Sequence, residues 1–209
     1  MSVHDLIPLL PEPAELRRRA LACAAAEAAA SDDGAYLTYH FTPEWGPGTA
    51  MMQLMNGSGD DLFIAFTGHG VFLWGFDHES EVSPWREHPR ELWPGLLDGL
   101  PPVFGHLVDN FADDGVLDAT FAAWWTPESG EWRCGPVEFP GGENDGAMWL
   151  CKVVAAEDPA AAFGKWAADY YGVPVDGRWA FAGDAPPDGA RRDAGELAAA
   201  LREMGYPGS

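Results

Sequence analysis

The stretch LFIAFTGHGVFLWGF, Leu62–Phe76, decides the fold of this chain. It contains two apolar runs separated by the tight turn TGHG, and short apolar runs bounded by glycine turns are typical of β-strands. Consecutive residues are apolar in both runs, whereas a strand with one solvent-exposed face would alternate apolar and polar residues. Both faces of this hairpin are therefore expected to be covered, as in the inner strands of a buried sheet.

The sequence before this hairpin adds two extended segments. Ala35–Phe41 mixes aromatic and small residues, and Thr49–Met55 is rich in methionine. The segment NGSGDD, Asn56–Asp61, follows, and its Asn-Gly pair favours a hairpin turn. Residues 35–76 are therefore predicted to form an antiparallel meander.

A second hairpin is predicted further along the chain. Leu117–Trp125 is strand-like, the segment TPESGE follows it, and Trp132–Cys134 is the expected returning strand. Between the two hairpins, Ser83 followed by Pro84 favours the start of a helix or turn. Val103–Phe111 places its large apolar residues on one helical face and is predicted to be a helix.

Helices are expected at both ends of the chain and in its second half. Capping residues and helical periodicity predict them at Pro13–Ala30, at Asp158–Gly172, and from an N-cap at Asp193 to a stop at Gly205. The apolar stripe of the second helix is expected to consist of Phe163, Trp166, Ala167 and Tyr170. Asp145–Val153 suits either a short helix or a strand.

Together these elements predict an α+β fold with a mainly antiparallel sheet, a meander plus a hairpin, flanked by several helices. Residues 1–209 are expected to form a single domain, because the length suits one and no internal repeat divides the sequence. Within it, residues 1–34 hold the N-terminal helix, residues 35–180 the core, and residues 181–209 a loop and the C-terminal helix.

The chain carries a formal net charge of −21, from 33 acidic and 12 basic side chains. Most of the imbalance lies in residues 41–180, which hold 22 acidic and six basic residues. Such a chain repels phosphate, so nucleic acids and anionic membranes are not expected as partners. A basic protein would be attracted instead, although solubility alone is a sufficient reason for the charge.

The three cysteines, Cys23, Cys134 and Cys151, have neither CxxC nor metal-ligand spacing. The N-terminus lacks the pattern of a signal peptide, and the Ala-rich residues 21–30 are too few and too weakly apolar to span a bilayer. A reduced, cytoplasmic protein without a cofactor is therefore expected. Arg133 would lower the pKa of the Cys134 thiol if that thiol were exposed, although a small buried cysteine is the commoner case.

Three ionisable residues, Asp77, His78 and Glu79, directly follow the second strand of the opening hairpin. If the strand continued, Asp77 and Glu79 would lie on one face about 6.6 Å apart, and His78 would face the other way. This arrangement disfavours a metal site built from the three residues, but the two carboxylates could bind a cation with another ligand or act as an acid–base pair. Alternatively, Asp77 or Ser80 caps the chain as it leaves the strand, or the segment belongs to a partner surface.

No HExxH, HxH or GxSxG motif and no phosphate-binding loop is present in the sequence, so no catalytic residue is named and no metal ligand is assigned. Tryptophan is unusually abundant, with ten residues. Alternation along a strand puts Trp124 and Trp125 on opposite faces, so one of them is a candidate for exposure, unless all tryptophans serve the core. Exposed tryptophans form sugar-stacking platforms or protein-binding anchors. The candidate functional or partner surface therefore comprises Asp77, His78, Glu79, Ser80, Trp85, Trp124, Trp125 and Trp132.

Four segments resemble an uncharacterised family of small acidic bacterial proteins: GFDHESEVSPW (Gly75–Trp85), GPVEFP (Gly135–Pro140), DGAMWL (Asp145–Leu150) and WAADYYGVPVD (Trp166–Asp176). The resemblance implies no established activity and no catalytic residue. In general style the chain is similar to the small acidic α+β immunity proteins encoded beside bacterial toxins, although it has no motif of the well-defined immunity families.

The function expected first is a non-enzymatic cytoplasmic protein that binds a basic protein through an acidic, aromatic-rich surface, with an immunity protein as one form of it. One alternative is a metal-dependent hydrolase or other enzyme that uses Asp77 and Glu79. Another is a carbohydrate-binding module that uses Trp124 or Trp125. The sequence names neither the partner nor the oligomeric state.

Overall fold

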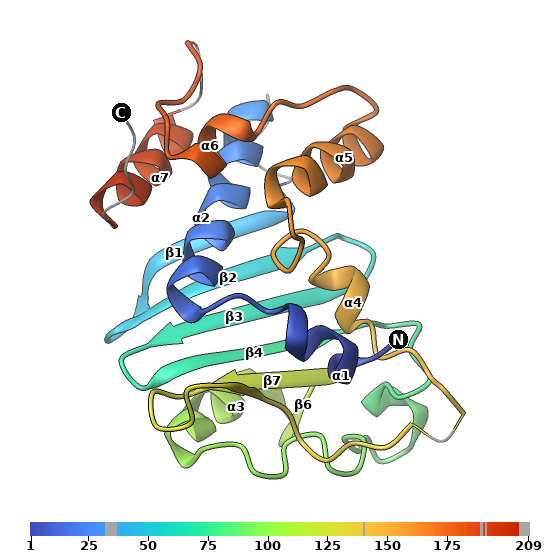
Figure 1. Ribbon diagram of the computed structural model, residues 1–209. Coiled ribbons are helices and arrows are strands. Elements are labelled where there is room, and N and C mark those ends of the chain that lie inside the picture. Colours follow the sequence, from blue (N-terminus) through green and yellow to red (C-terminus); the bar gives the residue numbers. More distant parts are fainter. Residues whose placement is uncertain (32–36, 140, 189, 191, 205–209) are drawn as a thin grey trace.

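The computed structural model describes residues 1–31, 37–139, 141–188, 190 and 192–204. In this part of the chain an antiparallel sheet of six strands has the order β1-β2-β3-β4-β7-β8 (Figure 1). The strands are β1 (Tyr39–Gly46), β2 (Thr49–Met55), β3 (Asp61–Thr67), β4 (Gly70–Phe76), β7 (Phe121–Trp125) and β8 (Trp132–Arg133). The first four form the predicted meander and the last two the predicted second hairpin, so the α+β fold is confirmed.

The two edges of the sheet are both irregular. In β1, Thr42 is opposite Met51 but Gly46 is opposite Thr49, so residues 43–45 bulge out against the single residue Ala50. At the other edge, β8 contributes only two residues.

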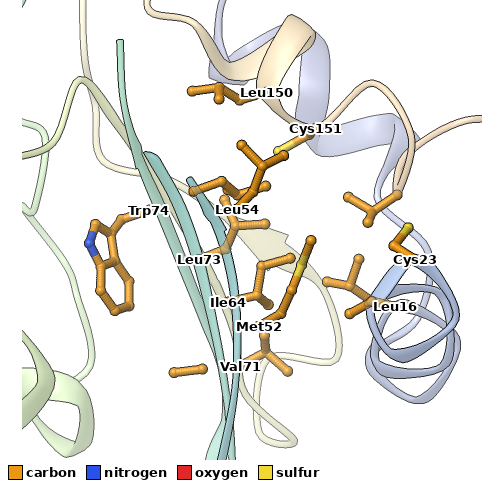
Figure 2. Close-up of a cluster of buried hydrophobic side chains, with 14 of the residues drawn as sticks. Leu16, Cys23, Met52, Leu54, Ile64, Val71, Leu73, Trp74, Leu150 and Cys151 are labelled. Carbon is orange, nitrogen blue, oxygen red and sulfur yellow. The ribbon is translucent and has the colours of Figure 1, made fainter. Parts of the chain in front are cut away.

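One face of the sheet is covered by α2 (Pro13–Ala30) and α4 (Ala147–Leu150). Figure 2 shows Leu16 and Cys23 of α2 directed at the sheet residues Met52 and Ile64, with Leu150 and Cys151 beside Leu54. All of these side chains are buried. Burial of apolar surface stabilises the folded state by roughly 25 cal/mol per Å². Because this layer buries many large apolar side chains, it contributes strongly to the free energy of unfolding.

The opposite face is covered by an aromatic cluster around Trp74, which Figure 2 shows pointing away from Leu73. The indole of Trp74 is 1% exposed, stacks on Phe63 at 5.0 Å and meets Phe111 edge-on at 5.0 Å. Phe111 ends α3 (Gly105–Phe111), which follows the 3₁₀ helix η4 (Pro102–Phe104). The prediction that the hairpin strands are covered on both faces is therefore confirmed.

Helix α2 carries a buried carboxylate, that of Glu27, in its last turn. Glu27 accepts hydrogen bonds from the backbone N–H groups of Thr38 and Tyr39, at 2.9 and 2.6 Å, and from the hydroxyl of Tyr171, at 2.7 Å. Burial raises the pKa of Glu27, although these hydrogen bonds act in the opposite direction. Glu27 thus connects α2 to the start of β1 and to the helix that contains Tyr171.

That helix is α5 (Pro159–Tyr171), and it begins and ends as predicted. The side chain of Asp158 accepts the N–H of Ala161, and Gly172 ends the helix in the left-handed conformation. The predicted stripe was wrong at Tyr170, which is 49% exposed, whereas its neighbour Tyr171 is half-buried against Glu27.

The remaining C-terminal elements are α6 (Arg178–Ala182) and α7 (Arg192–Glu203), and both contact α2. The predicted stop at Gly205 and the side chain of the predicted N-cap Asp193 lie outside the described residues. The organisation of residues 1–209 as a single domain stays a prediction.

Two local predictions were wrong or incomplete. The expected strand Leu117–Trp125 is interrupted: Leu117 ends the short hairpin of β5 (Ala112–Asp113) and β6 (Val116–Leu117), and β7 begins only at Phe121. At the N-terminus, α1 (Val3–Leu6) and the 3₁₀ helix η1 (Ile7–Leu9) were not foreseen. They are held by a long-range contact, because the N–H of Val3 donates to the buried carboxylate of Asp145 at 2.7 Å.

Candidate functional site

The chain turns sharply at the end of β4, and Asp77 makes the turn. Its carboxylate accepts the N–H of Glu79 at 3.0 Å and the indole N–H of Trp149 at 2.9 Å, and its own N–H donates to Thr120 at 3.1 Å. Ser80 bonds the carbonyl of Asn144 at 2.6 Å. The strand therefore stops at Phe76, the extended geometry considered for Asp77 and Glu79 was wrong, and the capping interpretation is confirmed.

His78 is fixed by Asp60, a residue that the sequence analysis did not single out. One oxygen of Asp60 accepts both the backbone N–H of His78, at 3.0 Å, and its imidazole Nδ1–H, at 2.7 Å. The hydrogen bond to Asp60 raises the pKa of His78. Burial alone would raise the pKa of Asp60, but the hydrogen bonds from His78 and Asn56 outweigh it, so that pKa is lowered.

The fold therefore brings together Asp60, Asp77 and His78, whose ligand atoms all lie within 4.8 Å of one another. They line a hollow of about 360 Å³ whose other walls are Glu79, Ser80, Glu81, Asn144 and Trp149. The side chain of Glu79 is 85% exposed and does not join the group, so the predicted Asp77–Glu79 pair is not formed. Both carboxylates of the group already accept hydrogen bonds that hold the turn, so the geometry is that of a strand exit.

Trp85 lies in the next turn, after the predicted cap at Ser83. The hydroxyl of Ser83 accepts the N–H of Trp85 at the start of the 3₁₀ helix η3 (Pro84–Arg86), which confirms the predicted Ser-Pro start. The residue is 59% exposed. Of the ten tryptophans, all of which belong to the described residues, Trp85 is the only one that is largely exposed.

Two side chains hold the indole of Trp85 in one orientation. Its N–H donates to the carboxylate of Asp118 at 3.0 Å, and the guanidinium of Arg90 lies over the ring at 4.4 Å from its centre. Arg90 is itself fixed by ion pairs with Asp118 at 3.2 Å and Asp113 at 3.3 Å. The predicted strand Leu117–Trp125 is broken between β6 and β7, and Asp118 lies in this break. The break therefore allows Asp118 to contact Trp85.

A hollow of about 440 Å³ lies beside this indole. It is lined by Trp85, Arg86, Glu87, His88, Pro89, Arg90, Asp113, Asp114 and Val116. The tip of the β5–β6 hairpin supplies Asp113 and Asp114, and Asp114 takes the left-handed conformation (φ 50°) that such a tight turn requires. We call Trp85, Glu87, Arg90, Asp113, Asp114 and Asp118 the Trp85 surface.

The other tryptophans of the predicted surface, Trp124, Trp125 and Trp132, are less exposed than Trp85. Trp124 is only 4% exposed, so it does not offer a ring to a sugar. Trp125 is half-buried, and Trp132 is half-buried with its indole N–H bonded to the carbonyl of Pro11 at 2.8 Å. The sequence places such residues on alternate faces of a strand but does not reveal which faces are covered.

Cys23 and Cys151 are buried, whereas Cys134 is partly exposed. Burial raises the pKa of Cys23 and of Cys151 far above the usual range, and burial together with the charge of Asp145 raises the pKa of Cys134. The condition for a lowered pKa, an exposed thiol beside Arg133, is not met, because Cys134 is only partly exposed; the guanidinium of Arg133 pairs with Glu131 at 2.6 Å.

Comparison with known proteins adds no relative: no family model, no curated protein and no solved structure matches the chain. Within the described part of the chain, no helix combines the length and the apolar character needed to cross a bilayer. The function is therefore argued from the geometry of the Trp85 surface and of the strand exit.

Proposed function

We propose that this protein is a non-enzymatic binding protein that holds a basic protein partner through the Trp85 surface. The observation that carries the proposal is the indole of Trp85, which is 59% exposed and yet fixed by Asp118 and Arg90. Exposed tryptophans of this kind are the residues most often found at the energetic centres of protein interfaces.

The fixed orientation supports an anchoring role. A mobile surface side chain loses roughly 0.5–1.5 kcal/mol of rotational freedom when a partner immobilises it. The indole N–H of Trp85 already has its acceptor, and the guanidinium of Arg90 already restricts the ring. Much of the rotational freedom of Trp85 is therefore already lost in the free folded protein, so less is lost on binding.

The charge around the indole supports a basic partner. The hollow and its rim contain the acids Glu87, Asp113, Asp114 and Asp118 and the bases Arg86 and Arg90, so the local net charge is −2. Both guanidinium groups are occupied, that of Arg86 by the carbonyls of Ser83 and Glu91 and that of Arg90 by carboxylates. With a net charge of −21 over the chain, long-range attraction for a basic protein follows.

The test begins with capture of partners from the native cell at low salt and identification of the basic protein retained. Its association and dissociation rates are then measured against the wild type and against Trp85→Ala. We expect Trp85→Ala to weaken the affinity by about 30-fold or more, mainly through faster dissociation, because an anchor of this kind contributes roughly 2 kcal/mol or more. Tyr170→Ala is the matched control, since Tyr170 is an exposed aromatic residue on α5.

Charge is tested separately with the double substitution Glu87→Gln and Asp114→Asn. Both side chains are exposed and neither pairs with Arg90, so the change should leave the fold and the orientation of Trp85 intact. We expect slower association and a weaker dependence on salt, with little change in dissociation. Unchanged rates in both the Trp85 variant and this double variant would exclude the Trp85 surface as the binding site.

An immunity protein that neutralises a basic toxin is one form of this proposal, and a cytoplasmic location belongs to it. A toxin gene beside the gene for this chain, with binding of its product to the Trp85 surface, would support that form.

A second candidate function is favoured by the grouping of Asp60, Asp77 and His78, which offers two carboxylates and an imidazole to a divalent cation. Thermal unfolding with and without Mn²⁺ or Zn²⁺ tests it, because a ligand of the native state raises the melting temperature. A rise that His78→Asn abolishes would support a metal site and would revive the enzyme interpretation with Asp60 in place of Glu79.

A further inference from the structure

A further pocket of the described structure lies away from both groups of residues discussed so far. It measures about 750 Å³ and is bounded by the first part of α2, the β1–β2 turn and the β3–β4 turn, which Figure 1 shows at the same side of the sheet. Its lining residues are Arg17, Pro43, Glu44, Gly46, Pro47, Gly48, Thr49, Ala50, Phe66, Thr67 and Gly68. A volume of this size holds a small organic molecule or the end of a peptide.

Arg17 is the unusual residue of this pocket. Its Nε–H is buried and has no hydrogen-bond partner, and no ion pair joins its guanidinium to another described residue. Its neighbours behave differently, because Arg18 and Arg19 both pair with Glu15 at 2.7 Å. The buried Nε–H is a donor without compensation for its lost hydration. The two terminal nitrogens of the same guanidinium are not buried and form no hydrogen bond or ion pair with another described residue, so they are the donors available to an acceptor group in the pocket.

The remaining walls favour a ligand with an apolar body. Ala50 and Phe66 are buried and supply apolar surface, and the buried Thr49 makes no hydrogen bond from its hydroxyl to another described residue. The hydroxyl of Thr67 is not available as a donor, because it already donates to the carbonyl of Gly70 at 3.0 Å. Arg17 and Thr49 are therefore the side-chain donors that remain for a ligand.

The charge of the pocket selects among anions. Arg17 is its one basic side chain, and Glu44 contributes a carboxylate that forms no ion pair with Arg17. A phosphate, with nearly two charges at neutral pH, would meet repulsion from Glu44 and from a chain of net charge −21. A single planar carboxylate matches the guanidinium in charge and in geometry.

We infer that this pocket binds a carboxylate, with the carboxylate on Arg17 and an attached apolar group on Ala50 and Phe66. The site is independent of the Trp85 surface. Two sources share this chemistry, a free small organic acid and the C-terminal carboxylate of a peptide.

The first experiment follows the Nε–Hε signal of Arg17 by NMR while benzoate is added to the full-length protein. We expect a saturable shift of that signal and of the Gly46, Gly48 and Gly68 amides, whereas inorganic phosphate at the same concentration gives at most a small fraction of it. An absence of shift up to about 20 mM benzoate, well above a 1 mM dissociation constant, would overturn the proposal. An equal shift with phosphate would overturn the assignment to carboxylates.

Substitutions then test the roles of the two charges. Arg17→Gln is expected to weaken benzoate binding at least 10-fold, as loss of charge-assisted hydrogen bonds requires. Glu44→Gln is expected to tighten it about two- to fivefold, because a like charge is removed. Arg178→Gln removes the same charge from a surface pair with Asp176 and should leave binding unchanged. Benzoate binding that is equal in Arg17→Gln and the wild type would contradict the site.

The two sources are separated by comparing benzoate with a Gly-Gly-Phe peptide that ends in a free acid and with the same peptide amidated. Tighter binding of the free-acid peptide than of benzoate, lost on amidation, identifies a peptide C-terminus as the ligand. Weaker binding of that peptide than of benzoate identifies a small free acid. Equal binding of the acid and the amide would overturn the carboxylate requirement.

Discussion

At the scale of single residues, Asp145 shows how a buried carboxylate is stabilised by backbone donors. Its oxygens accept the N–H groups of Val3, at 2.7 Å, and Ala147, at 3.0 Å, and the residue is fully buried. Burial raises the pKa of Asp145 to about 6, although the two N–H groups act to lower it. The N-terminal segment and α4 are thereby joined through a group that titrates near neutral pH.

A pH dependence follows from this shift. The folded protein binds the Asp145 proton more tightly than the unfolded chain, so the stability linked to it is present below about pH 4 and is lost as pH rises through about 6. We expect the unfolding free energy of the wild type, relative to Asp145→Asn, to fall by about 2.5 kcal/mol between pH 4 and pH 7. Urea unfolding of both proteins at several pH values measures it, and a difference that does not change with pH would contradict the assignment.

The residues that could be predicted from the sequence are those whose partners are close along the chain. Ser83 caps Trp85, and Asp158 caps Ala161, within three residues. The pairs that shape the candidate sites are distant: Asp60 and His78 lie 18 residues apart, and Trp85 and Asp118 lie 33 apart. A sequence pattern does not contain such pairs, because they exist only once β3 and β4 are aligned and the β5–β6 hairpin has folded back.

At the scale of elements, Glu27 joins three of them. It receives hydrogen bonds from Thr38, directly before β1, from Tyr39, the first residue of β1, and from Tyr171 at the end of α5, and it is 0% exposed. The sequence placed this acid on the apolar side of a helix, where a carboxylate is costly unless donors surround it. The three donors explain why the helix tolerates it.

Removing this carboxylate should be strongly destabilising. Glu27→Ala leaves the N–H groups of Thr38 and Tyr39 buried without an acceptor, so we expect a loss of roughly 2–4 kcal/mol in the free energy of unfolding. Tyr171→Phe removes one hydrogen bond to the same carboxylate and leaves both backbone bonds, so about 1 kcal/mol is expected. Chemical denaturation of the two variants compares them. Equal losses would show that the backbone donors do not depend on Glu27.

The elements themselves were predictable to the extent that their signals are local. Glycine turns bound the meander, and caps bound α5. The run Leu117–Trp125 was assigned as one strand because its residues are suitable for one, yet Thr120 leaves that path and bonds the carbonyl of Asp145 at 2.6 Å. The short helix α1 depends on Asp145 in the same way, so neither feature could be read from its own segment.

At the scale of the whole molecule, the dominant quantity is the net charge of −21. Few acids are neutralised within the described structure, where the basic partners of ion pairs include Arg18, Arg19, Arg90, Arg133 and Arg178. Repulsion among the remaining carboxylates favours expansion of the chain and therefore lowers the stability of the compact state.

Added salt should therefore stabilise the protein. We expect the melting temperature to rise by several degrees between about 10 mM and about 300 mM NaCl, because the screening length falls below the spacing of the surface charges. A variant with glutamine at Glu79, Glu81, Glu87 and Glu91, all of them exposed, should show a smaller rise. Calorimetry of both proteins measures it, and a melting temperature that falls with salt would show that attractive pairs dominate instead.

The irregular borders of the sheet have a consequence for assembly. The regular part of β1 is only Tyr39–Thr42. It is followed by Pro43, which lacks an N–H group, and by the bulge of residues 43–45. At the other edge, β8 ends after two residues. Neither border offers a long, flat ladder of unpaired peptide groups onto which a foreign strand or a second copy could add, as fibril growth requires. Within the described residues, side chains therefore offer a partner more contact surface than the edges of this sheet do.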